Sequence, residues 1–395
     1  MDKRMKLKYY CLNFLAFAAI SMVNTQMIPY LTSVGYDVVE RGYILAANAI
    51  VAIIGQLVFG YICDKYKKIK PFFAVAYALL VISALLMFCF QKQMFWYHLL
   101  TVAVMGGMVK VIMGLDETWM LEADSENYGV LRAYGALGLT IGSPIAGFLV
   151  DSFGYIALSI TLGIISAFCF LFIWLVKDVS KSGEPIQLSS LTKLLQNKPY
   201  LLLVMIYLLI YMIGTADQYV VIDKMMEMKA EHALVGFKWA LQSFMEIPLF
   251  LLAHRILKRY KPSVLLIFGT LMYAVKFVMY AWADNSWWII AAASLQLVTL
   301  PVIMLTSKVL IKEITPEELF SSAQMFAMAI FIGVSGLVTP LITSYLSDLL
   351  GYDFTLYLIA GFAIVPLLLI FLYLYIRKKH QSDKQSCVNN QKQLQ

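Results

Sequence analysis

Long apolar stretches alternate with short polar segments along the whole chain. Reading apolar windows between charged clusters and Gly or Pro residues predicts twelve spans. They begin near residues 9, 42, 71, 97, 131, 157, 199, 234, 263, 287, 321 and 353. Residues 71–90 are apolar throughout, whereas a barrel strand has about 10 residues of alternating polarity. The pattern therefore predicts an all-α membrane protein with twelve transmembrane helices, each able to cross roughly 30 Å of hydrocarbon.

The composition agrees with this class. Hydrophobic residues make up 61% of the 395 residues and charged residues only 14%, against about 25% charged residues in a soluble domain. The five cysteines include no C-x-x-C pair, so we expect neither a disulfide framework nor a metal site. A water-soluble fold and a disulfide-rich secreted protein are therefore excluded.

The distribution of Lys and Arg between the spans predicts the orientation. With the N-terminus in the cytoplasm, about 24 basic residues flank the cytoplasmic ends and about four lie outside, namely Arg41, Lys92, Lys224 and Lys229. An even number of helices places the C-terminus in the cytoplasm too. We expect a multi-pass, monomeric protein of the cytoplasmic cell membrane. The net charge of +7 follows from this rule, so no nucleic-acid partner is expected.

A polar segment near the midpoint separates six spans from six. We expect an N-terminal bundle over residues 1–176, a cytoplasmic central loop over 177–198, a C-terminal bundle over 199–376 and a cytoplasmic polar tail over 377–395. The sequence DSFGY at 151–155, after span five, recurs as DLLGY at 348–352, after span eleven. Two parallel six-helix repeats are typical of secondary transporters, which bind their solute between the repeats near the membrane midplane.

The loop between spans two and three carries Gly60-x-x-x-Asp64-Lys65-x-Lys67-Lys68. It resembles the G-x-x-x-D-[RK]-x-G-[RK]-[RK] signature of the major facilitator superfamily, with Lys67 where the second glycine is usual. We expect Gly60 to allow a close helix approach and Asp64 to face a neighbouring helix N-terminus, while the lysines hold the loop in the cytoplasm. Such a latch would stabilise one access state. The alternative is an ordinary positive-inside loop with an acid at its turn.

A second resemblance lies in YGVLRAYGALG at residues 128–138 and EIP at 246–248. These segments are similar to the lactose permease, nucleoside:proton symporter and 3-phenylpropionate permease group. The resemblance implies the major facilitator fold and proton-driven import of a small organic solute of the glycoside, nucleoside or aromatic-acid class. It implies no cofactor, because the proton gradient is the driving force. This chain has Leu139, Gln296 and Thr299 at the positions where lactose permease has a tryptophan, a histidine and a glutamate. Lactose itself is therefore not implied.

Charged residues inside the apolar spans point to a wet interior. Facing lipid at a helix centre, each costs roughly 2.5 to 3.5 kcal/mol, so we expect them to face a shared cavity and to pair with one another. The residues concerned are Lys110, Asp116, Glu117, Asp217, Lys238, Glu246 and Lys276.

We expect two roles among these residues. Proton coupling is assigned to Glu246, paired with Lys276, and to Asp116, because gaining or losing a cationic partner changes the protonation of a buried carboxylate. Substrate binding is assigned to Lys110, Glu117, Arg132, Asp217 and Gln296.

Each assignment has an alternative. Asp116 and Glu117 would be inexpensive at the cytoplasmic interface. Lys238, about one turn into its span, would extend its ammonium outward to water, which is favoured over a substrate role. Asp217 would equally suit an outer gate. Arg132 would cap the start of span five, although the family resemblance favours an acid partner such as Glu117 or Glu122.

No motif for catalysis is present. The chain lacks H-E-x-x-H, G-x-S-x-G and a P-loop, so an intramembrane enzyme is not expected and no catalytic residue is assigned. The motif Gly138-x-x-x-Gly142-Ser-Pro144 loosely resembles that of drug:proton antiporters, but glycines at this spacing are explained by close helix packing. A proton-coupled drug exporter of the same fold is the alternative function.

Overall fold

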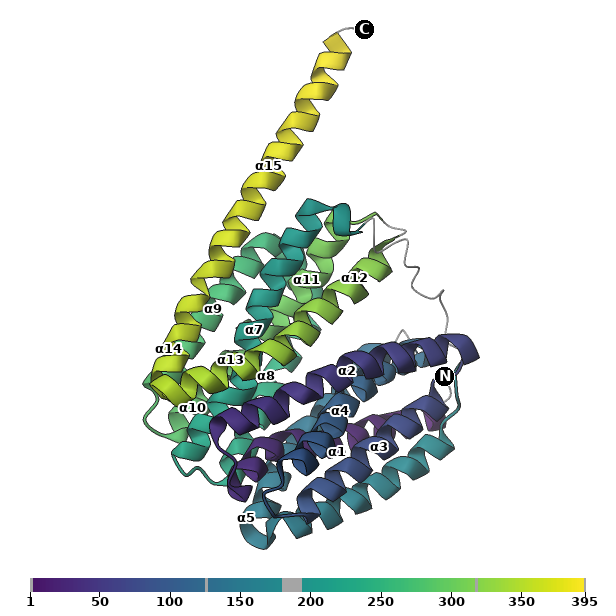
Figure 1. Ribbon diagram of the computed structural model, residues 1–395. Coiled ribbons are helices and arrows are strands. Elements are labelled where there is room, and N and C mark those ends of the chain that lie inside the picture. The colour runs from purple at the N-terminus through teal and green to yellow at the C-terminus, as the bar shows by residue number, and fades with distance from the viewer. Residues whose placement is uncertain (1–2, 125–126, 180–193, 317–318, 394–395) are drawn as a thin grey trace.

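The computed structural model describes residues 3–124, 127–179, 194–316 and 319–393, and within them all regular structure is helical. Figure 1 shows two groups of helices, α1–α5 and α7–α15, that lie against each other. Residues 180–193, most of the expected central loop, lie outside the described residues. The all-α prediction is confirmed.

The first group has five helical elements. They are α1 (Lys3–Val34), α2 (Val38–Tyr66), α3 (Lys70–Cys89), α4 (Phe95–Asp124) and α5 (Tyr128–Leu175). The helix α5 contains two spans, because Gly154 inside it has a left-handed φ of 77° and interrupts the helical backbone. Asp37 caps α2, and Pro71 occupies the first turn of α3, where no N–H partner is needed.

The second group is more interrupted. Its elements are α7 (Lys198–Glu227), α8 (His232–Arg259), α9 (Pro262–Trp282), α10 (Ser286–Ala293), the 3₁₀ turn η2 (Ser294–Val298), α11 (Leu300–Ile314), α12 (Phe320–Met328), the π turn η4 (Ala329–Val334), α13 (Ser335–Leu350), α14 (Tyr352–Phe362) and α15 (Ile364–Gln393). The expected polar tail therefore continues α15 as a helix as far as Gln393.

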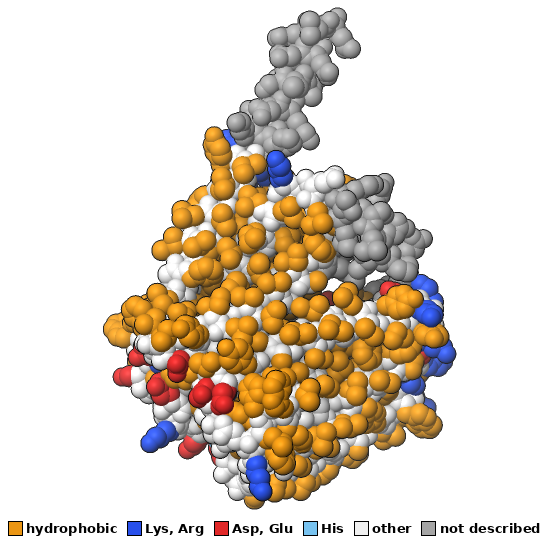
Figure 2. Space-filling view, in the orientation of Figure 1, with side chains coloured by type: hydrophobic (Ala, Val, Ile, Leu, Met, Phe, Trp, Pro, Cys, Tyr) orange, Lys and Arg blue, Asp and Glu red, His pale blue; other side chains and the backbone are white. Residues whose placement is uncertain are grey.

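The helices account for twelve spans within the described residues. Ten segments are long and apolar enough to cross a membrane, and the 48-residue α5 counts twice because of its break. The remaining span is α8, whose 28 residues include charged and amide side chains that lower its mean hydropathy. Figure 2 shows hydrophobic side chains over most of the visible face of both groups, as expected for a surface against lipid.

The internal repeat is visible in the backbone. Gly154 and Gly351, at matching places in DSFGY and DLLGY, have φ values of 77° and 79°. Both glycines separate two consecutive helices, because a left-handed φ is accessible to glycine without a steric penalty. The sequence repeat therefore marks the same turn in the two halves.

Two helix pairs make most of the contact between the halves. The helix α5 packs against α1 in its own half and against α8 of the other, and α2 packs against α13. Figure 1 shows α2 and α13 running alongside each other where the two groups meet. Gly138 and Gly142 lie so close to α1 that an added Cβ would meet the backbone of Phe14 and Ala18. The close-packing interpretation of these glycines is confirmed.

Candidate functional site

The centre of the second half contains a buried cluster of charges. The carboxylate of Asp217, on α7, lies between two ammonium groups, 2.9 Å from Lys238 Nζ and 2.7 Å from Lys276 Nζ. Both lysine side chains are fully buried, and that of Asp217 is 6% exposed. Three helices, α7, α8 and α9, therefore meet at one carboxylate that two ammonium groups share.

The cluster continues to a second carboxylate through an amide. Lys276 Nζ donates to Gln296 Oε1 at 2.7 Å, and Gln296 Nε2 donates to Glu246 Oε1 at 2.8 Å. Gln296 therefore joins a positive charge to a negative one, using its acceptor on one side and its donor on the other. With all four charged groups ionised, the chain Lys238–Asp217–Lys276–Gln296–Glu246 carries no net charge.

The helix α8 contributes three polar side chains to the cluster. Lys238, Gln242 and Glu246 follow one another at intervals of four residues and so share one side of the helix. Gln242 Nε2 donates to Asp217 Oδ2 at 2.6 Å. Gln242 was not among the expected site residues, although its spacing of four residues from Lys238 and from Glu246 was the available signal.

A break in the helix positions Gln296. It lies in the 3₁₀ turn η2, between α10 and α11, and is 6% exposed. The backbone leaves helical geometry at Thr299, where φ is −106° and ψ is −98°, two residues before Pro301 in the first turn of α11. Short 3₁₀ stretches inside a long helix often mark functional positions.

The expected residues of the first half occupy α4 and the start of α5. Lys110 and Glu117 are half-buried, and Tyr128 donates to Glu117 Oε1 at 3.3 Å. Within the described residues, the ammonium of Lys110 has no hydrogen-bond or ion-pair partner. Asp116 is only 2% exposed. Its Oδ1 has no hydrogen-bond partner in the described part of the chain.

Arg132 is exposed and stacks on an aromatic ring. Its guanidinium carbon lies 5.1 Å from the centre of the Phe17 ring. The salt bridges of the described residues include none to Arg132, so the expected pairing with Glu117 or Glu122 is not found. Arg132 therefore joins α5 to α1 through a cation–π contact.

The expected latch residues lie at the end of α2. Lys65 and Lys68 are exposed, and Lys67 has a left-handed φ of 51°. That backbone explains why glycine is usual at this position of the signature. The close approach expected at Gly60 is not found, because an added Cβ there has no described atom within 4 Å. The acid at the start of α3 is Asp178, which accepts from Ile69 N and Lys70 N at 3.2 and 2.9 Å.

Two further sequence expectations are corrected. Lys238 does not extend outward, because its ammonium is held inside by Asp217. The direct pairing of Glu246 with Lys276 is wrong, since Lys276 pairs with Asp217 and reaches Glu246 only through Gln296. The rotation of α7 about its axis, which hydropathy does not determine, decides which carboxylate faces Lys276.

Polar contacts join the two halves where α2 and α8 begin. Arg41 Nη2 lies 2.7 Å from Asp223 Oδ1, and both side chains are 7% exposed. Asp151 Oδ1 lies 2.7 Å from His232 Nδ1 and also accepts from His232 N at 3.0 Å. These partnerships are not visible in the sequence, because the residues are about 80 or more positions apart.

Two of the four basic residues expected outside are buried. Arg41 belongs to the contact between the halves, and Lys224 is 1% exposed. Lys224 Nζ donates to the Tyr280 and Ala281 carbonyl oxygens at 2.8 and 3.0 Å and pairs with Asp353 at 2.7 Å. These charges stabilise helix ends inside the protein.

Comparisons with known proteins agree with this arrangement. The model of the MFS_1 like family matches residues 5–358. The chain belongs to this family. Because of this family match, the MFS_1 like protein is a membrane transporter and not an enzyme, as the sequence predicted. None of the curated proteins compared with it shows significant sequence similarity.

Solved structures support the fold of this MFS_1 like protein. A mutant of the nucleoside transporter NupG is similar at a TM-score of 0.82 and 15% identity, over 93% of this chain and 99% of that one. The POT family transporter PepTSo is similar at a TM-score of 0.74 and 10% identity, over 96% and 99%. Identities this low establish the shared major facilitator fold alone.

Proposed function

We propose that this secondary transporter moves a small organic solute by proton symport, with the solute bound between the halves. The observation that carries this proposal is the buried chain Lys238–Asp217–Lys276–Gln296–Glu246. Charged residues inside membrane-spanning bundles are costly even when paired, and they commonly mark ion or solute pathways. Glycosides, nucleosides and aromatic acids are the solute classes considered.

The two carboxylates of the chain have different partners. Asp217 has two ammonium groups beside it, which stabilise its ionised form. The hydrogen bond of Glu246 comes from the neutral amide of Gln296, and Glu246 is only half-buried. We therefore assign the transported proton to Glu246 and a fixed charge-balancing role to Asp217.

Residues of the first half supply groups for the solute. Lys110 and Glu117 share one side of α4, seven residues apart. The unpaired ammonium of Lys110 is suited to a polar or anionic group of the solute. Protonation of Glu246 would remove the negative charge that Gln296 links to Lys276. We assign the coupling between protonation and solute binding to this change in the balance of charge. Asp116 remains a second candidate for proton transfer.

The proposal includes an orientation and an access state. We place both termini in the cytoplasm, with the lysine-rich loop of residues 64–70 on the same side. The contacts of Arg41 with Asp223 and of Asp151 with His232 then close the outer side. We infer from these contacts a state that is closed on the outer side.

The first step in testing the proposed function is to identify a solute that binds. Thermal-shift screening of purified protein against the three solute classes identifies a binder, because ligand at 100 times its Kd stabilises by about 2.7 kcal/mol. Uptake of that binder into proteoliposomes is then measured with an imposed inward proton gradient. Accumulation supports symport, and extrusion assigns the exporter function instead.

The role of Glu246 has its own variant. Glu246→Gln is expected to bind solute but to lose accumulation driven by the proton gradient. Glu313→Gln is the matched control, because Glu313 pairs with Arg377 away from the cluster. Uptake by Glu246→Gln with unchanged dependence on the pH gradient would eliminate this assignment.

A further inference from the structure

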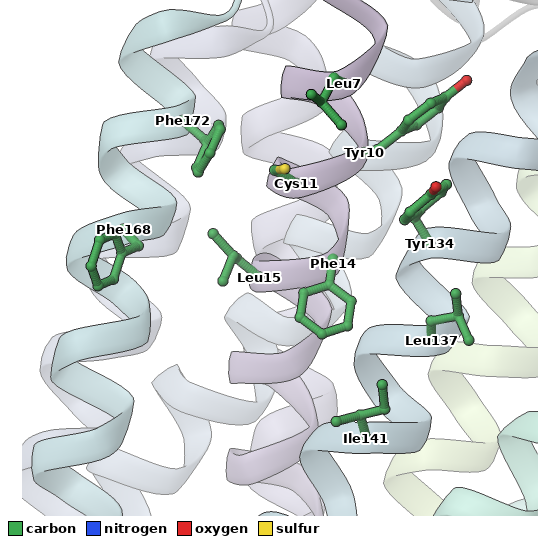
Figure 3. A pocket seen from close by; sticks show the side chains of 10 residues that line it. All are labelled: Leu7, Tyr10, Cys11, Phe14, Leu15, Tyr134, Leu137, Ile141, Phe168 and Phe172. Atoms are coloured by element: carbon green, nitrogen blue, oxygen red, sulfur yellow. The ribbon is translucent and has the colours of Figure 1, made fainter.

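An apolar groove runs along the outside of the first half. It encloses about 440 Å³ between α1 and the two parts of α5. Figure 3 shows Leu7 and Phe172 at one end and Ile141 at the other, with Cys11 and Leu137 between them. The groove extends over about two turns of α1, or roughly 12 Å at 1.5 Å per residue.

The walls of the groove face away from the solute site. Leu7, Leu137 and Phe168 are 60%, 39% and 54% exposed, as for side chains that meet hydrocarbon. The rings of Tyr10 and Tyr134 stack 4.5 Å apart and nearly parallel, which closes one side of the groove. A rigid aromatic wall holds the groove open for a chain-like apolar occupant.

Basic side chains gather at one end of the groove. Arg4 and Lys8 precede Leu7 and Cys11 by three residues each, so they share the groove side of α1. The Tyr9 hydroxyl donates to the Lys177 carbonyl oxygen at 2.7 Å, which places this third basic residue at the same end.

Two other charged residues at this end have partners within the protein. Lys6 is directed to Asp124, 3.4 Å away, on another side of α1. The Asp178 carboxylate accepts from the backbone N–H groups of Ile69 and Lys70. Arg4 and Lys8 have no hydrogen-bond or ion-pair partner within the described residues, so their charges are available to an outside group.

We propose that the groove binds one acyl chain of an anionic phospholipid, whose phosphate group lies against Arg4 and Lys8. An apolar groove alone would not select a lipid, because the surrounding acyl chains are equally apolar. Basic pockets between transmembrane helices select anionic headgroups. The structure combines both features within two turns of α1, and this lipid site is independent of the proposed transport cycle.

Native mass spectrometry of the full-length protein tests the proposal. The detergent-purified protein is incubated with equal amounts of phosphatidylglycerol and phosphatidylcholine that carry the same acyl chains. We expect one phosphatidylglycerol to be retained at least about fivefold more often than phosphatidylcholine, a difference of about 1 kcal/mol. Equal retention of the two lipids overturns the proposal.

Variants separate the headgroup from the groove. The double variant Arg4→Gln, Lys8→Gln is expected to retain phosphatidylglycerol only at the phosphatidylcholine level. Leu137→Trp, which fills the groove, is expected to reduce retention of both lipids. The matched control, Arg255→Gln with Lys258→Gln, removes the same charge at the exposed end of α8 and should behave as the unmodified protein.

Three results would contradict the assignment. Equal loss of phosphatidylglycerol in the control shows a general charge effect. Unchanged retention in Leu137→Trp, folded by circular dichroism, shows that the acyl chain does not occupy the groove. A protein dimer that Leu137→Trp abolishes would assign the groove to a second copy of the chain.

Discussion

The two junctions between the halves use equivalent helices but different chemistry. At the first junction α8 begins after Glu231, which makes no side-chain cap. Its first N–H groups, those of His232 and Ala233, donate instead to Asp151 on α5 of the other half, at 3.0 and 2.8 Å. The start of α8 therefore depends on the closed junction for its hydrogen bonds.

At the second junction, the first N–H groups of α2 find their hydrogen-bond acceptors within the same segment of chain. Asp37 caps α2 by accepting from Glu40 N at 2.8 Å, and the Glu40 carboxylate accepts from Asp37 N at 3.2 Å. Contact with the other half is made by the buried pair of Arg41 and Asp223, with the Tyr352 hydroxyl 3.5 Å from Arg41. Asp348, the counterpart of Asp151 in the repeat, is exposed and without a partner in the described residues.

The two halves of this protein therefore share the glycine turn at Gly154 and Gly351, but they do not share the contact that Asp151 makes with the start of α8. Opening the first junction transfers the N–H groups of α8 from a carboxylate to water. Opening the second exposes a buried ion pair that the protein environment had already desolvated. We therefore expect the two junctions to respond differently to the same kind of change.

The largest effect is expected at the second junction. Asp223→Asn leaves the Arg41 guanidinium buried without a carboxylate, which costs about 3 to 5 kcal/mol. Hydrogen exchange of the amides in residues 38–45 should rise strongly. The double variant Arg41→Gln, Asp223→Asn leaves no unpaired charge and should recover part of the protection. Unchanged exchange in Asp223→Asn would show that the pair does not hold this junction.

Glycines at the fifth residue of each helix distinguish the junctions further. An added Cβ at Gly236 in α8 would meet the backbone of Ser143, whereas one at Gly42 in α2 would meet two side-chain atoms of Ser344, of which Oγ can rotate away and Cβ cannot. Gly236→Ala should destabilise the closed state by about 1 to 3 kcal/mol and Gly42→Ala by less. Thermal unfolding in detergent measures both.

A control checks the helix-propensity contribution. Gly60→Ala, with open space around it among the described residues, should raise the melting temperature slightly, because alanine favours helix by up to about 1 kcal/mol. Equal destabilisation by Gly236→Ala and Gly42→Ala would remove the distinction between the two glycines.

The carboxylates of the repeat give a matched pair of variants. Asp151→Ala removes the acceptor at the start of α8 and should cost about 0.5 to 2 kcal/mol, as for loss of a helix cap. Asp348→Ala should have almost no effect. Hydrogen exchange of residues 232–236 and thermal unfolding report the difference. A similar response of the two variants would mean that Asp151 contributes nothing specific to this junction.

The smallest effect is expected from salt. The Asp151 and His232 side chains are 26% and 21% exposed, against 7% for each partner at the second junction. Raising the salt concentration from 0.15 to 1 M shortens the Debye length from about 8 to 3 Å, so the first junction should loosen by under about 1 kcal/mol. Hydrogen exchange should rise around residue 232 and stay constant around residue 41.

The sequence shows most of the charged residues of the central cluster, but it does not show which of them pair with one another. The charged residues of the central cluster stood out because they interrupt apolar spans, and burial of Lys276 and Asp217 is the expected consequence. Gln242 carries no charge and was missed. The residues at the two junctions were missed too, since Asp223 and His232 look like ordinary residues at the ends of spans.

The sequence by itself determined the number of spans, roughly where most of them begin, and the repeat. Removing a peptide from water depends mainly on the apolar content of each segment, which can be read along the chain. Only the tertiary structure decided that Asp217, and not Glu246, pairs with Lys276. It also decided that Asp151 accepts from the first N–H groups of α8, while Asp348 accepts from no helix in the described part of the chain. Such pairings depend on the rotation and relative height of packed helices, which separate segments of sequence do not specify.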